Sequence, residues 1–549
     1  MKKLNIEAIV LIIFCTAFLW FAAGNILDNK ITHDFPVGFF ASDSFQNYGI
    51  AEGIKESGNY KFQPMSVAGG YKDVVGTHYP TIYHLTALFS VQTGIKVYDS
   101  LIFMIIFLLL STSLMMYFII RKFSKGAAMI ALPLMMLVSY SKFSSAITWG
   151  QHGAITGSFF LVALLWAFTK FELNNPFFII IFLSGTFFGH QPEFVFGLGF
   201  IFLYFVLKFI RKDLKAGDIK KIITIGVITL LIISYYLIIF KFAWVSAGFS
   251  ALEIVSVEKF LEGRAFPPVL LFDDFNFLIL IFSFIGIAIV SLMLFKKKNT
   301  LSAAMLFLFL LGLTNYIGAG HKAFQQRFLW PIYLSAFFGI GIYYAIKFIM
   351  KRVNVIFSAG VFILLLIIFI PAFGGKTNAG SSIDAAHWAG FDWIRDNVEM
   401  DKPVYFLYQD MIGQRSIYYA STQRETYVLD VGSFIQDIQS GMIKRSYKMV
   451  LSAEGGAGLP YRKSLFEFGK HMSEVAERMK ERVDICTMPY IVFDKVSSQE
   501  ALSTYNLMIA NELLKNEWIS VVYGDNPSVV IIKNNRPGVD CIEERSFNE

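Results

Sequence analysis

Residues 41–58 have the sequence ASDSFQNYGIAEGIKESG and follow an apolar segment at residues 5–24. They place an acid, Asp43, at the start of an amphipathic helical pattern, where the chain has only just left that segment. Ionisable groups near membrane depth are costly and commonly functional. The meaning of Asp43 therefore depends on whether the neighbouring segments cross a membrane.

The composition indicates a membrane protein. The chain has 549 residues, of which 55% are hydrophobic, 17% aromatic and 16% charged, and its mean hydropathy is +0.55. These values are too apolar for a soluble globular protein. The net charge of +7 does not imply nucleic acid, because basic residues of membrane proteins gather on cytoplasmic loops. Since the sequence contains no P-loop and no Rossmann fingerprint, no nucleotide cofactor is expected.

Eleven apolar runs approach the roughly 20 residues needed to span a bilayer, although the fifth is short. They lie at residues 5–24, 99–120, 126–140, 153–170, 176–189, 194–210, 222–242, 275–295, 300–317, 329–349 and 354–372. The predicted fold class is therefore a polytopic α-helical membrane protein with about 11 spans.

Basic residues mark alternate loops between these runs, for example Arg121 to Lys125 and Lys296 to Lys298. By the positive-inside rule, these loops face the cytoplasm. The N-terminus is then inside, and an odd number of spans carries the C-terminus outside. We expect a transmembrane domain at residues 1–372, with a first external loop at 25–98, and an external domain at 373–549.

The patterns in residues 373–549 predict a small α/β domain. Two apolar strands at 518–525 and 528–535 flank a turn with GDNP and form a hairpin. Further strand patterns lie at 403–409, 426–430 and 490–495, and helical patterns at 387–397, 461–482 and 498–516. The sequence is compatible with a disulfide between Cys486 and Cys541 and leaves that pairing open.

The polar groups expected outside indicate a single external site. All eight histidines fall in the predicted external segments or at their edges. They are His33, His78, His84, His152, His190, His321, His387 and His471. Histidine is polar and avoids membrane spans for that reason alone. The informative observation is that all eight are predicted on the same side of the membrane.

This layout resembles the membrane glycosyltransferases of the C superfamily. Within that group it is most similar to prokaryotic, especially archaeal, relatives of the oligosaccharyltransferase catalytic subunit. The similar segments are DSFQNYGIAEGI at 43–54, HYPTIYHLTALFSVQTGI at 78–95, RFLWPIYLSAFFGIGI at 327–342 and AAHWAGFDWIRDN at 385–397. The resemblance implies a multi-pass protein of a prokaryotic cell membrane with an extracytoplasmic C-terminal domain.

The resemblance implies that Asp43 lies at the reaction centre, as a metal ligand or as the group that orients or deprotonates the acceptor. The helix after it would lie at the membrane interface. A lipid-linked sugar donor would meet a protein, glycan or lipid acceptor there, beside the membrane lipids. The alternative is that Asp43 is the N-cap of that helix and accepts from backbone donors of residues 45 and 46.

Arg327 is the candidate for binding the donor phosphate, because an arginine can hold phosphate oxygens bidentately. The resemblance implies a lipid-phosphate contact at this position. Lys322 and His321 are neighbouring helpers. The alternative is that Arg327 is an interfacial anchor whose charged end snorkels to the membrane surface.

A divalent ion, Mn or Mg, would be held by Asp43, His152, His190 and Glu193, whose turns all lie on the external side. Gln151 is a candidate sugar contact. The oligosaccharyltransferase subunit supplies acidic metal ligands from its second external loop, whereas TWGQHG at 148–153 contains no carboxylate. Histidines at turns also serve as helix caps, so this alternative stays open.

Candidate acceptor contacts are His78, Tyr79, His84, Asp410 and Arg415. Tyr79 is alternatively an aromatic-belt anchor. The sequon-reading motif of oligosaccharyltransferases, Trp-Trp-Asp-Tyr-Gly, is absent, and its expected place holds YQDMIG at 408–413. The sequence therefore favours an acceptor other than a sequon asparagine.

The predicted function is transfer of a sugar or glycan from a polyprenyl-phosphate-linked donor on the external face. The alternative is a transporter or flippase for a lipid-linked or small polar substrate, which would be expected to show inverted repeats and polar residues at the bilayer midplane. A non-catalytic assembly or receptor protein is a third interpretation.

Overall fold

The computed structural model describes the greater part of the chain. The described residues are 5–25, 27, 30–58, 74–75, 80–239, 277–297, 299–313, 330–350, 353–373, 381–407, 424, 426–429, 436, 438–439, 441–450, 461–462, 482–495 and 500–546.

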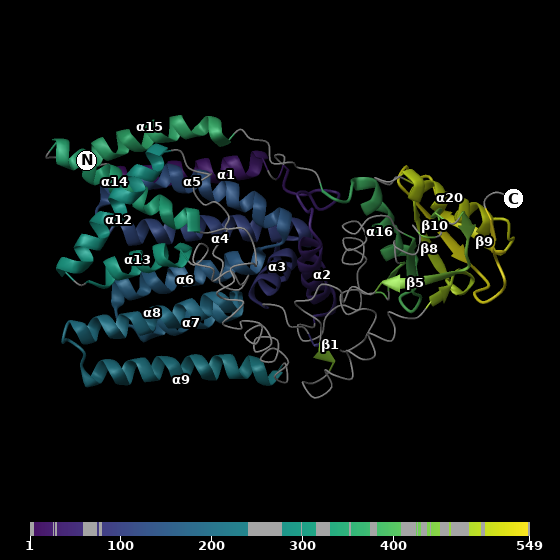
Figure 1. The fold of residues 1–549 in the computed structure, drawn as a ribbon, viewed down its shortest axis with the longest axis horizontal. Helices are drawn as coiled ribbons and strands as arrows, with labels where there is room; N and C mark the ends of the chain where they lie inside the picture. Colours follow the sequence, from purple (N-terminus) through teal and green to yellow (C-terminus); the bar gives the residue numbers. More distant parts are fainter. Residues whose placement is uncertain are drawn as a thin grey trace.

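Each apolar run predicted from the sequence forms a helix, most with similar bounds; α5 continues nine residues beyond the predicted end, and α9 begins six residues before the predicted start. These helices are α1 (Ile6–Asn25), α4 (Val97–Ile120), α5 (Lys125–Trp149), α6 (His152–Phe171), α7 (Pro176–Gly189), α8 (Gln191–Ile210), α9 (Ala216–Ile239), α12 (Phe277–Lys297), α13 (Thr300–Leu313), α14 (Trp330–Met350) and α15 (Val355–Phe373). They form one bundle at one end of the molecule (Figure 1).

Five of these helices are long and apolar enough to cross a membrane, judged by length and composition among the described residues. They are α4, α6, α8, α12 and α14. The apolar parts of α1, α5, α7, α13 and α15 are shorter, at 10–17 residues. The number of spans and their orientation therefore stay predictions.

Helices α12 and α14 pack backbone to backbone because each has a glycine at the crossing. A Cβ on Gly341 would lie 1.8 Å from the carbonyl oxygen of Phe282, and a Cβ on Gly286 would lie 2.0 Å from that of Phe337. Small residues permit this close approach between membrane helices.

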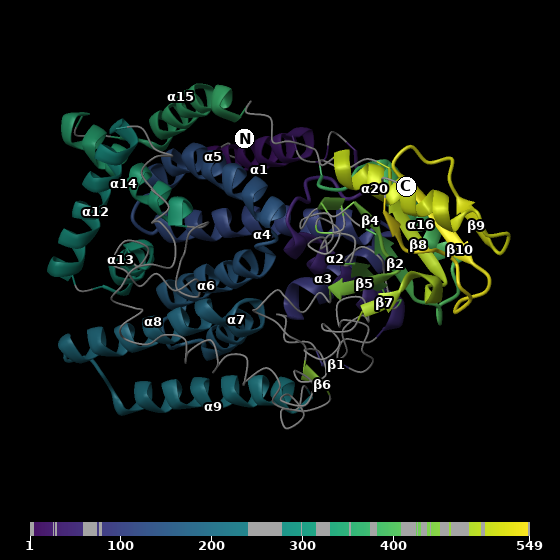
Figure 2. The same ribbon diagram turned by 45° about the vertical axis from the view of Figure 1, so that its right-hand side comes forward.

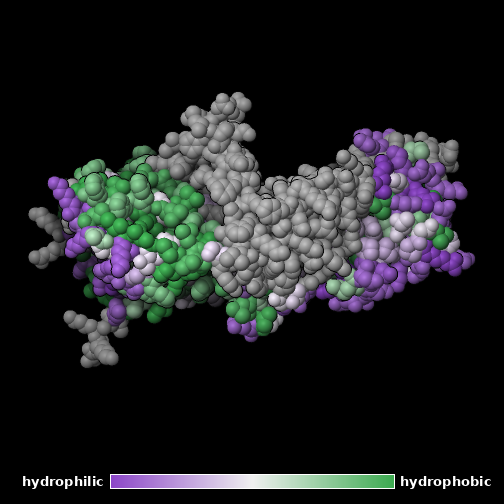
Figure 3. Space-filling model, turned by 90° about the horizontal axis from the view of Figure 1, so that it is seen from below, coloured by the Kyte–Doolittle hydropathy of each residue, from purple (hydrophilic) through white to green (hydrophobic). Residues whose placement is uncertain are grey.

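Apolar side chains cover the outside of the bundle. Leu230 of α9, Leu292 of α12 and Leu364 of α15 are all exposed. Figure 3 shows a largely apolar surface over this part of the molecule and a polar surface over the C-terminal part. Such a continuous apolar surface is what lipid contact requires.

The segment predicted to form the first external loop, residues 25–98, contributes α2 (Ser42–Ser57) and α3 (Pro80–Thr93). Both lie between the bundle and the C-terminal sheet (Figures 1 and 2). Residues 47–53 of α2 are all buried, which covers every side of a helix. The expectation of an amphipathic helix is therefore wrong for this buried part, because α2 is enclosed by α3, α4, α5 and residues of the C-terminal part. Its location at the membrane interface stays a prediction.

The C-terminal part contains α16 (Ala385–Asn397), α20 (Glu500–Leu513) and a seven-stranded sheet. The sheet order is β7-β5-β3-β2-β8-β10-β9, with β2 parallel to β3 and β8 and the other pairs antiparallel. Its strands are β2 (Val404–Leu407), β3 (Thr426–Leu429), β5 (Ser446–Val450), β7 (Arg482–Asp484), β8 (Tyr490–Asp494), β9 (Ile519–Tyr523) and β10 (Val529–Asn534). The predicted strands and the β9–β10 hairpin are confirmed.

Two short strand pairs lie outside this sheet. β1 (Val74–Val75) of the first external loop pairs with β6 (Tyr461–Arg462), and β4 (Met442–Ile443) pairs with β11 (Arg545–Ser546). The predicted helix at 461–482 is wrong at both ends, where β6 and β7 lie, and residues 463–481 are outside the described residues. Long-range pairing overrides local helical pattern at these ends.

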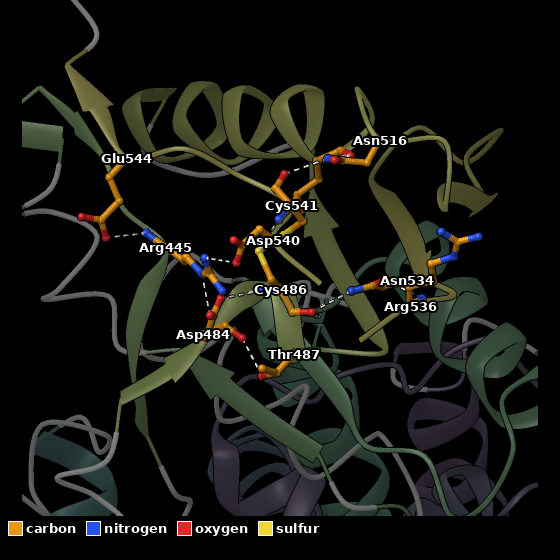
Figure 4. Close-up of a disulfide and its surroundings, with 11 residues drawn as sticks. Arg445, Asp484, Cys486, Thr487, Asn516, Asn534, Arg536, Asp540, Cys541 and Glu544 are labelled. Atoms are coloured by element: carbon orange, nitrogen blue, oxygen red, sulfur yellow. Dashed lines mark hydrogen bonds and ion pairs between the residues drawn. A yellow bond between two sulfur atoms is a disulfide. The ribbon is translucent and has the colours of Figure 1, made fainter. Parts of the chain in front are cut away.

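Cys486 and Cys541 form a disulfide, which settles the pairing that the sequence left open. Cys486 lies in the short turn η4 (Ile485–Thr487). Arg445 flanks the bond and binds Asp484 at 2.5 Å and Asp540 at 2.6 Å (Figure 4). The bond ties the C-terminal segment to the sheet.

Candidate active site

Asp43 is the second residue of α2, and its side chain is exposed. The N-cap is Ala41, which makes no side-chain capping bond. The alternative in which Asp43 caps the helix is therefore wrong. A carboxylate in the first turn is stabilised by the partial positive charge of the helix N-terminus. Asp43 thus presents a carboxylate at the surface just before the buried middle part of α2.

The end of α5 fixes the backbone on both sides of Asp43. The N–H of Ala41 donates to the carbonyl of Thr148 at 2.9 Å, and the Ser44 hydroxyl donates to that of Ile147 at 2.5 Å. These two bonds join the start of α2 to the last turn of α5.

Gly150 forms the turn from α5 to α6 and lies directly against Asp43. Its φ is +69°, and a Cβ at this position would lie 2.6 Å from the carbonyl carbon and the Cβ of Asp43. Both the positive φ and the close approach require glycine. The turn therefore sets the position of Asp43 through direct backbone packing.

Asn47 lies one helical turn after Asp43 and joins three helices. Its side-chain nitrogen donates to the carbonyl of Gly150 at 2.9 Å and lies 2.9 Å from Nδ1 of His152. Its side-chain oxygen accepts from the Tyr83 hydroxyl at 2.6 Å. Since the amide nitrogen is a donor, Nδ1 of His152 acts as the acceptor. This network holds the α5–α6 turn against α2.

His190 and Glu193 form an ion pair at the turn between α7 and α8. A Cβ on Gly157 would lie 2.6 Å from the Cβ of His190, so α6 packs directly on this pair. Within the described residues, no group of three or more His, Cys, Asp or Glu side chains forms a metal site. The described residues therefore do not group Asp43 and His152 with this pair, and the metal set stays a prediction. Nδ1 of His152 bonds the side chain of Asn47, while its buried Nε2 has no hydrogen-bond partner among the described residues.

Two other predicted site residues are described. Gln151 is the half-buried residue between Gly150 and His152, so it follows directly on the glycine that contacts Asp43. The imidazole of His84 bonds the carbonyl of Pro80 at 2.6 Å within α3. The remaining candidates lie outside the described residues, and they are His78, Tyr79, His321, Lys322, Arg327, Asp410 and Arg415.

A second polar cluster, missed from the sequence, connects the first external loop to the start of α4. The imidazole of His33 lies 2.7 Å from the carboxylate of buried Asp99, and the backbone N–H of His33 donates to the same carboxylate at 2.9 Å. This hydrogen bond raises the pKa of His33, and burial opposes it only in part. Tyr98 donates to the backbone carbonyl of His33 at 2.6 Å. The cluster fixes the loop that leads to α2.

The C-terminal part meets the bundle along α2. The N–H of Ser382 donates to the carbonyl of Phe39 at 2.8 Å. The ring of Trp388 in α16 packs edge-on against Tyr48 at 5.5 Å and Tyr98 at 5.6 Å between centroids. Arg395 donates to the Tyr48 hydroxyl at 3.0 Å. The helix that carries Asp43 is therefore held from both sides.

Solved structures of membrane glycosyltransferases resemble this architecture. The archaeal oligosaccharyltransferase AglB from Archaeoglobus fulgidus, in complex with an inhibitory peptide and a dolichol-phosphate, has a TM-score of 0.51 at 14% identity, over 92% of this chain and 72% of that chain. ArnT from Cupriavidus metallidurans bound to undecaprenyl phosphate has a TM-score of 0.54 at 10% identity, over 97% of this chain and 98% of that chain.

A further structure of the Archaeoglobus enzyme, in complex with Zn and sulfate, has a TM-score of 0.50 at 14% identity, over 88% of this chain and 68% of that chain. Neither a protein-family model nor a curated protein matches the sequence. The resemblance inferred from the sequence is confirmed at the level of the fold, and the chain has the fold of the membrane glycosyltransferases of the C superfamily.

Proposed function

We propose that the protein is an integral membrane glycosyltransferase that moves a sugar or glycan from a polyprenyl-phosphate-linked donor to an acceptor on the external face of the membrane. The observation that carries this proposal is the exposed carboxylate of Asp43, fixed by backbone contacts where the bundle meets the C-terminal part. The fold shared with two lipid-dependent glycosyltransferases supports it.

In this proposal Asp43 is the general base. As the acceptor attacks the anomeric carbon, its nucleophilic O–H or N–H gives its proton to the Asp43 carboxylate. The bond from the anomeric carbon to the phosphate oxygen breaks, and the polyprenyl phosphate leaves with the bonding electrons. A new bond joins the acceptor to the sugar, and Asp43 later releases the proton to water.

The leaving lipid phosphate needs cations near its developing charge. We assign this role to Arg327, with Lys322 and His321 beside it, because a guanidinium binds two phosphate oxygens at once. Gln151 is assigned to the sugar because it follows the turn that contacts Asp43. No step runs through a Mn or Mg ion, since the four predicted ligands are not assembled as one site.

The acceptor assignments rest on the sequence. His78, Tyr79, His84, Asp410 and Arg415 remain the candidate contacts to a protein, glycan or lipid acceptor. Of these, only His84 is among the described residues, and its imidazole bonds the carbonyl of Pro80 within α3.

Two observations support an external C-terminal domain. Disulfides persist in oxidising compartments and are rare in the cytosol, and this part of the chain contains the Cys486–Cys541 bond. The Lys- and Arg-rich loops between apolar runs predict the same orientation.

The experiment uses proteoliposomes that contain a radiolabelled polyprenyl-phosphate sugar in the leaflet facing the C-terminal domain. A glycosyltransferase releases the label from lipid to an acceptor or to water. A flippase moves the label to the other leaflet while it stays bound to lipid. Label that moves but never leaves the lipid would contradict the proposed enzyme and favour the transporter.

A further inference from the structure

A pocket of about 250 Å³ lies on the other side of α2 from Asp43. Its walls come from α2, from α16 and from the turn before α4, and they include Glu52, Lys96 and Arg395. Glu52 follows Asp43 by nine residues, which is about 13 Å along a helix and half a turn around it. The pocket is therefore separate from the surface that presents Asp43.

Two charged groups face this pocket with hydrogen-bonding capacity to spare. The side chain of Glu52 belongs to a residue only 8% exposed, and among the described residues no hydrogen bond or ion pair reaches its carboxylate. Burial raises the pKa of Glu52, and the neighbouring Arg395 offsets this only in part. Nε of Arg395 is buried with no hydrogen-bond partner in the described part of the chain.

Arg395 is held on the opposite wall. It donates to the hydroxyl of Tyr48 at 3.0 Å and lies 3.9 Å from the carboxylate of Asp392, the limit of an ion pair. The charges of Glu52 and Arg395 attract one another, but no hydrogen bond or ion pair joins the two side chains within the described structure. Because buried charges are costly without partners, a ligand that both accepts from the guanidinium and donates to the carboxylate fits the gap.

The lining of the pocket narrows the class of ligand. Lys55, Lys96 and Arg395 supply three positive charges, and three carboxylates balance them. Because these charges are equal in number, the lining has no net charge that would attract a simple anion or a simple cation. A sugar hydroxyl both donates and accepts hydrogen bonds, so neighbouring hydroxyls of one ring can donate to the carboxylates and accept from the basic groups.

Aromatic rings and size agree with a sugar. Trp388 packs edge-on against Tyr48 and Tyr98, whose own rings are tilted to each other, and all three line the pocket. Aromatic rings offer apolar surface to the CH groups of a sugar ring. The volume of about 250 Å³ is below the range of pockets that hold drug-sized ligands, which indicates one sugar unit rather than a chain.

We infer that this pocket binds one neutral sugar residue of a glycan substrate, away from the bond that reacts. The inference rests on the proposed glycosyltransferase function. The sugar belongs either to the donor glycan or to a glycan acceptor, and both sources present the same hydroxyl chemistry to Glu52 and Arg395.

The binding test uses the full chain in lipid nanodiscs without sugar-based detergent. Saturation-transfer NMR is recorded with glucose, galactose, mannose and N-acetylglucosamine, each added alone. Wild type should bind at least one of them, and Glu52→Met should weaken that binding at least tenfold. Glu56→Gln, an exposed acid one turn further along α2, and Asp43→Asn should bind as wild type does.

The design separates failure of folding from failure of the inference. The Glu52 carboxylate is buried and makes no hydrogen bond or ion pair among the described residues, so an apolar side chain of similar length removes a desolvation cost. The melting temperature of Glu52→Met should therefore not fall. If wild type binds none of these sugars, or if Glu52→Met binds them equally well, the inference that this pocket binds a sugar is overturned. Sugar binding by a wild type that shows no transfer contradicts the proposed function and leaves the pocket standing.

A second arm separates the two sources. KM is measured for lipid-linked monosaccharide and disaccharide donors and for a glycan acceptor. A tenfold higher KM of Glu52→Met for the disaccharide donor alone assigns the pocket to the donor, and the same rise for the acceptor alone assigns it to the acceptor. Unchanged KM for all three would overturn the inference.

Discussion

Replacing Gly150 by alanine tests whether the α5–α6 turn positions Asp43. The φ of +69° at Gly150 disfavours any other residue by about 1–2 kcal/mol. The added Cβ would lie 2.6 Å from the backbone of Asp43 and Ser44, whereas ordinary contacts begin near 3.4 Å. Either the turn or the start of α2 must therefore move by about 0.8 Å.

A displacement of this size is large for catalysis. A misplacement of about 1 Å costs on the order of 100-fold in rate. We therefore expect Gly150→Ala to lower turnover of a polyprenyl-phosphate sugar by about 10- to 100-fold. The assay measures release of radiolabelled sugar from lipid by protein purified in nanodiscs, with the melting temperature recorded on the same sample.

Gly94→Ala is the matched control. Gly94 also has a positive φ, +73°, and forms a turn between two helices, but a Cβ there would meet no atom within 4 Å. This variant therefore carries the backbone strain without the contact to Asp43. Turnover of Gly94→Ala should stay near wild type. Equal turnover of Gly150→Ala and Gly94→Ala would refute the argument that packing at the turn sets the position of Asp43.

Three further predictions concern stability. Asn47→Leu removes three hydrogen bonds from a buried network, and we expect it to destabilise the protein by about 1–3 kcal/mol in thermal unfolding and to lower turnover; an unchanged melting temperature would contradict this. The Asp99 hydrogen bond raises the pKa of His33 from 6.5, so the pair stabilises the fold fully below pH 6.5 and this contribution is lost as pH rises through the folded pKa. The melting-temperature advantage of wild type over His33→Asn should shrink over that rise, and a constant advantage would count against the charged pair. Cys541→Ser should cost about 2–5 kcal/mol in thermal unfolding while Cys15→Ser should cost little, and a wild type whose thiol titration from intact cells shows three free cysteines would contradict the disulfide.

The helices of the bundle could be predicted because long apolar runs are local features of the sequence. Runs such as 99–120 and 222–242 are recognised from their apolar composition alone. The structure has helices α4 and α9 at these positions. The hairpin of β9 and β10 was also local, since two apolar strands flank a short turn. Each of these elements depends on residues close together in the sequence.

The elements that were predicted wrongly depend on distant partners. β6 forms because it pairs with β1, almost 400 residues earlier, and no local pattern contains this information. The first external helix is amphipathic in isolation. It is enclosed because Trp388 and Arg395 of α16 pack on Tyr48, which only the assembled fold reveals.

Some residues of the candidate site could be found from the sequence, and others could not. Asp43 was found through resemblance to a family. Asn47 was missed because its role lies in bonds to α3 and to the turn and first residue of α6, which no local sequence pattern contains. The four-ligand metal set was inferred from the side on which each turn is predicted to lie, and the described residues do not group these four side chains as one site.

The central claim is that the carboxylate of Asp43 performs the transfer chemistry. The most direct measurement compares wild type, Asp43→Asn and Asp34→Asn for hydrolysis and transfer of radiolabelled polyprenyl-phosphate sugars, with donor binding measured in parallel. Asp34 is the matched control because it is an exposed acid in the same loop. Loss of a general base costs about 100- to 10,000-fold in rate, so Asp43→Asn should bind donor and turn over at 1% of wild type or less, while Asp34→Asn stays near wild type. Equal turnover by Asp43→Asn, or no turnover by wild type across a broad donor panel, would contradict the account.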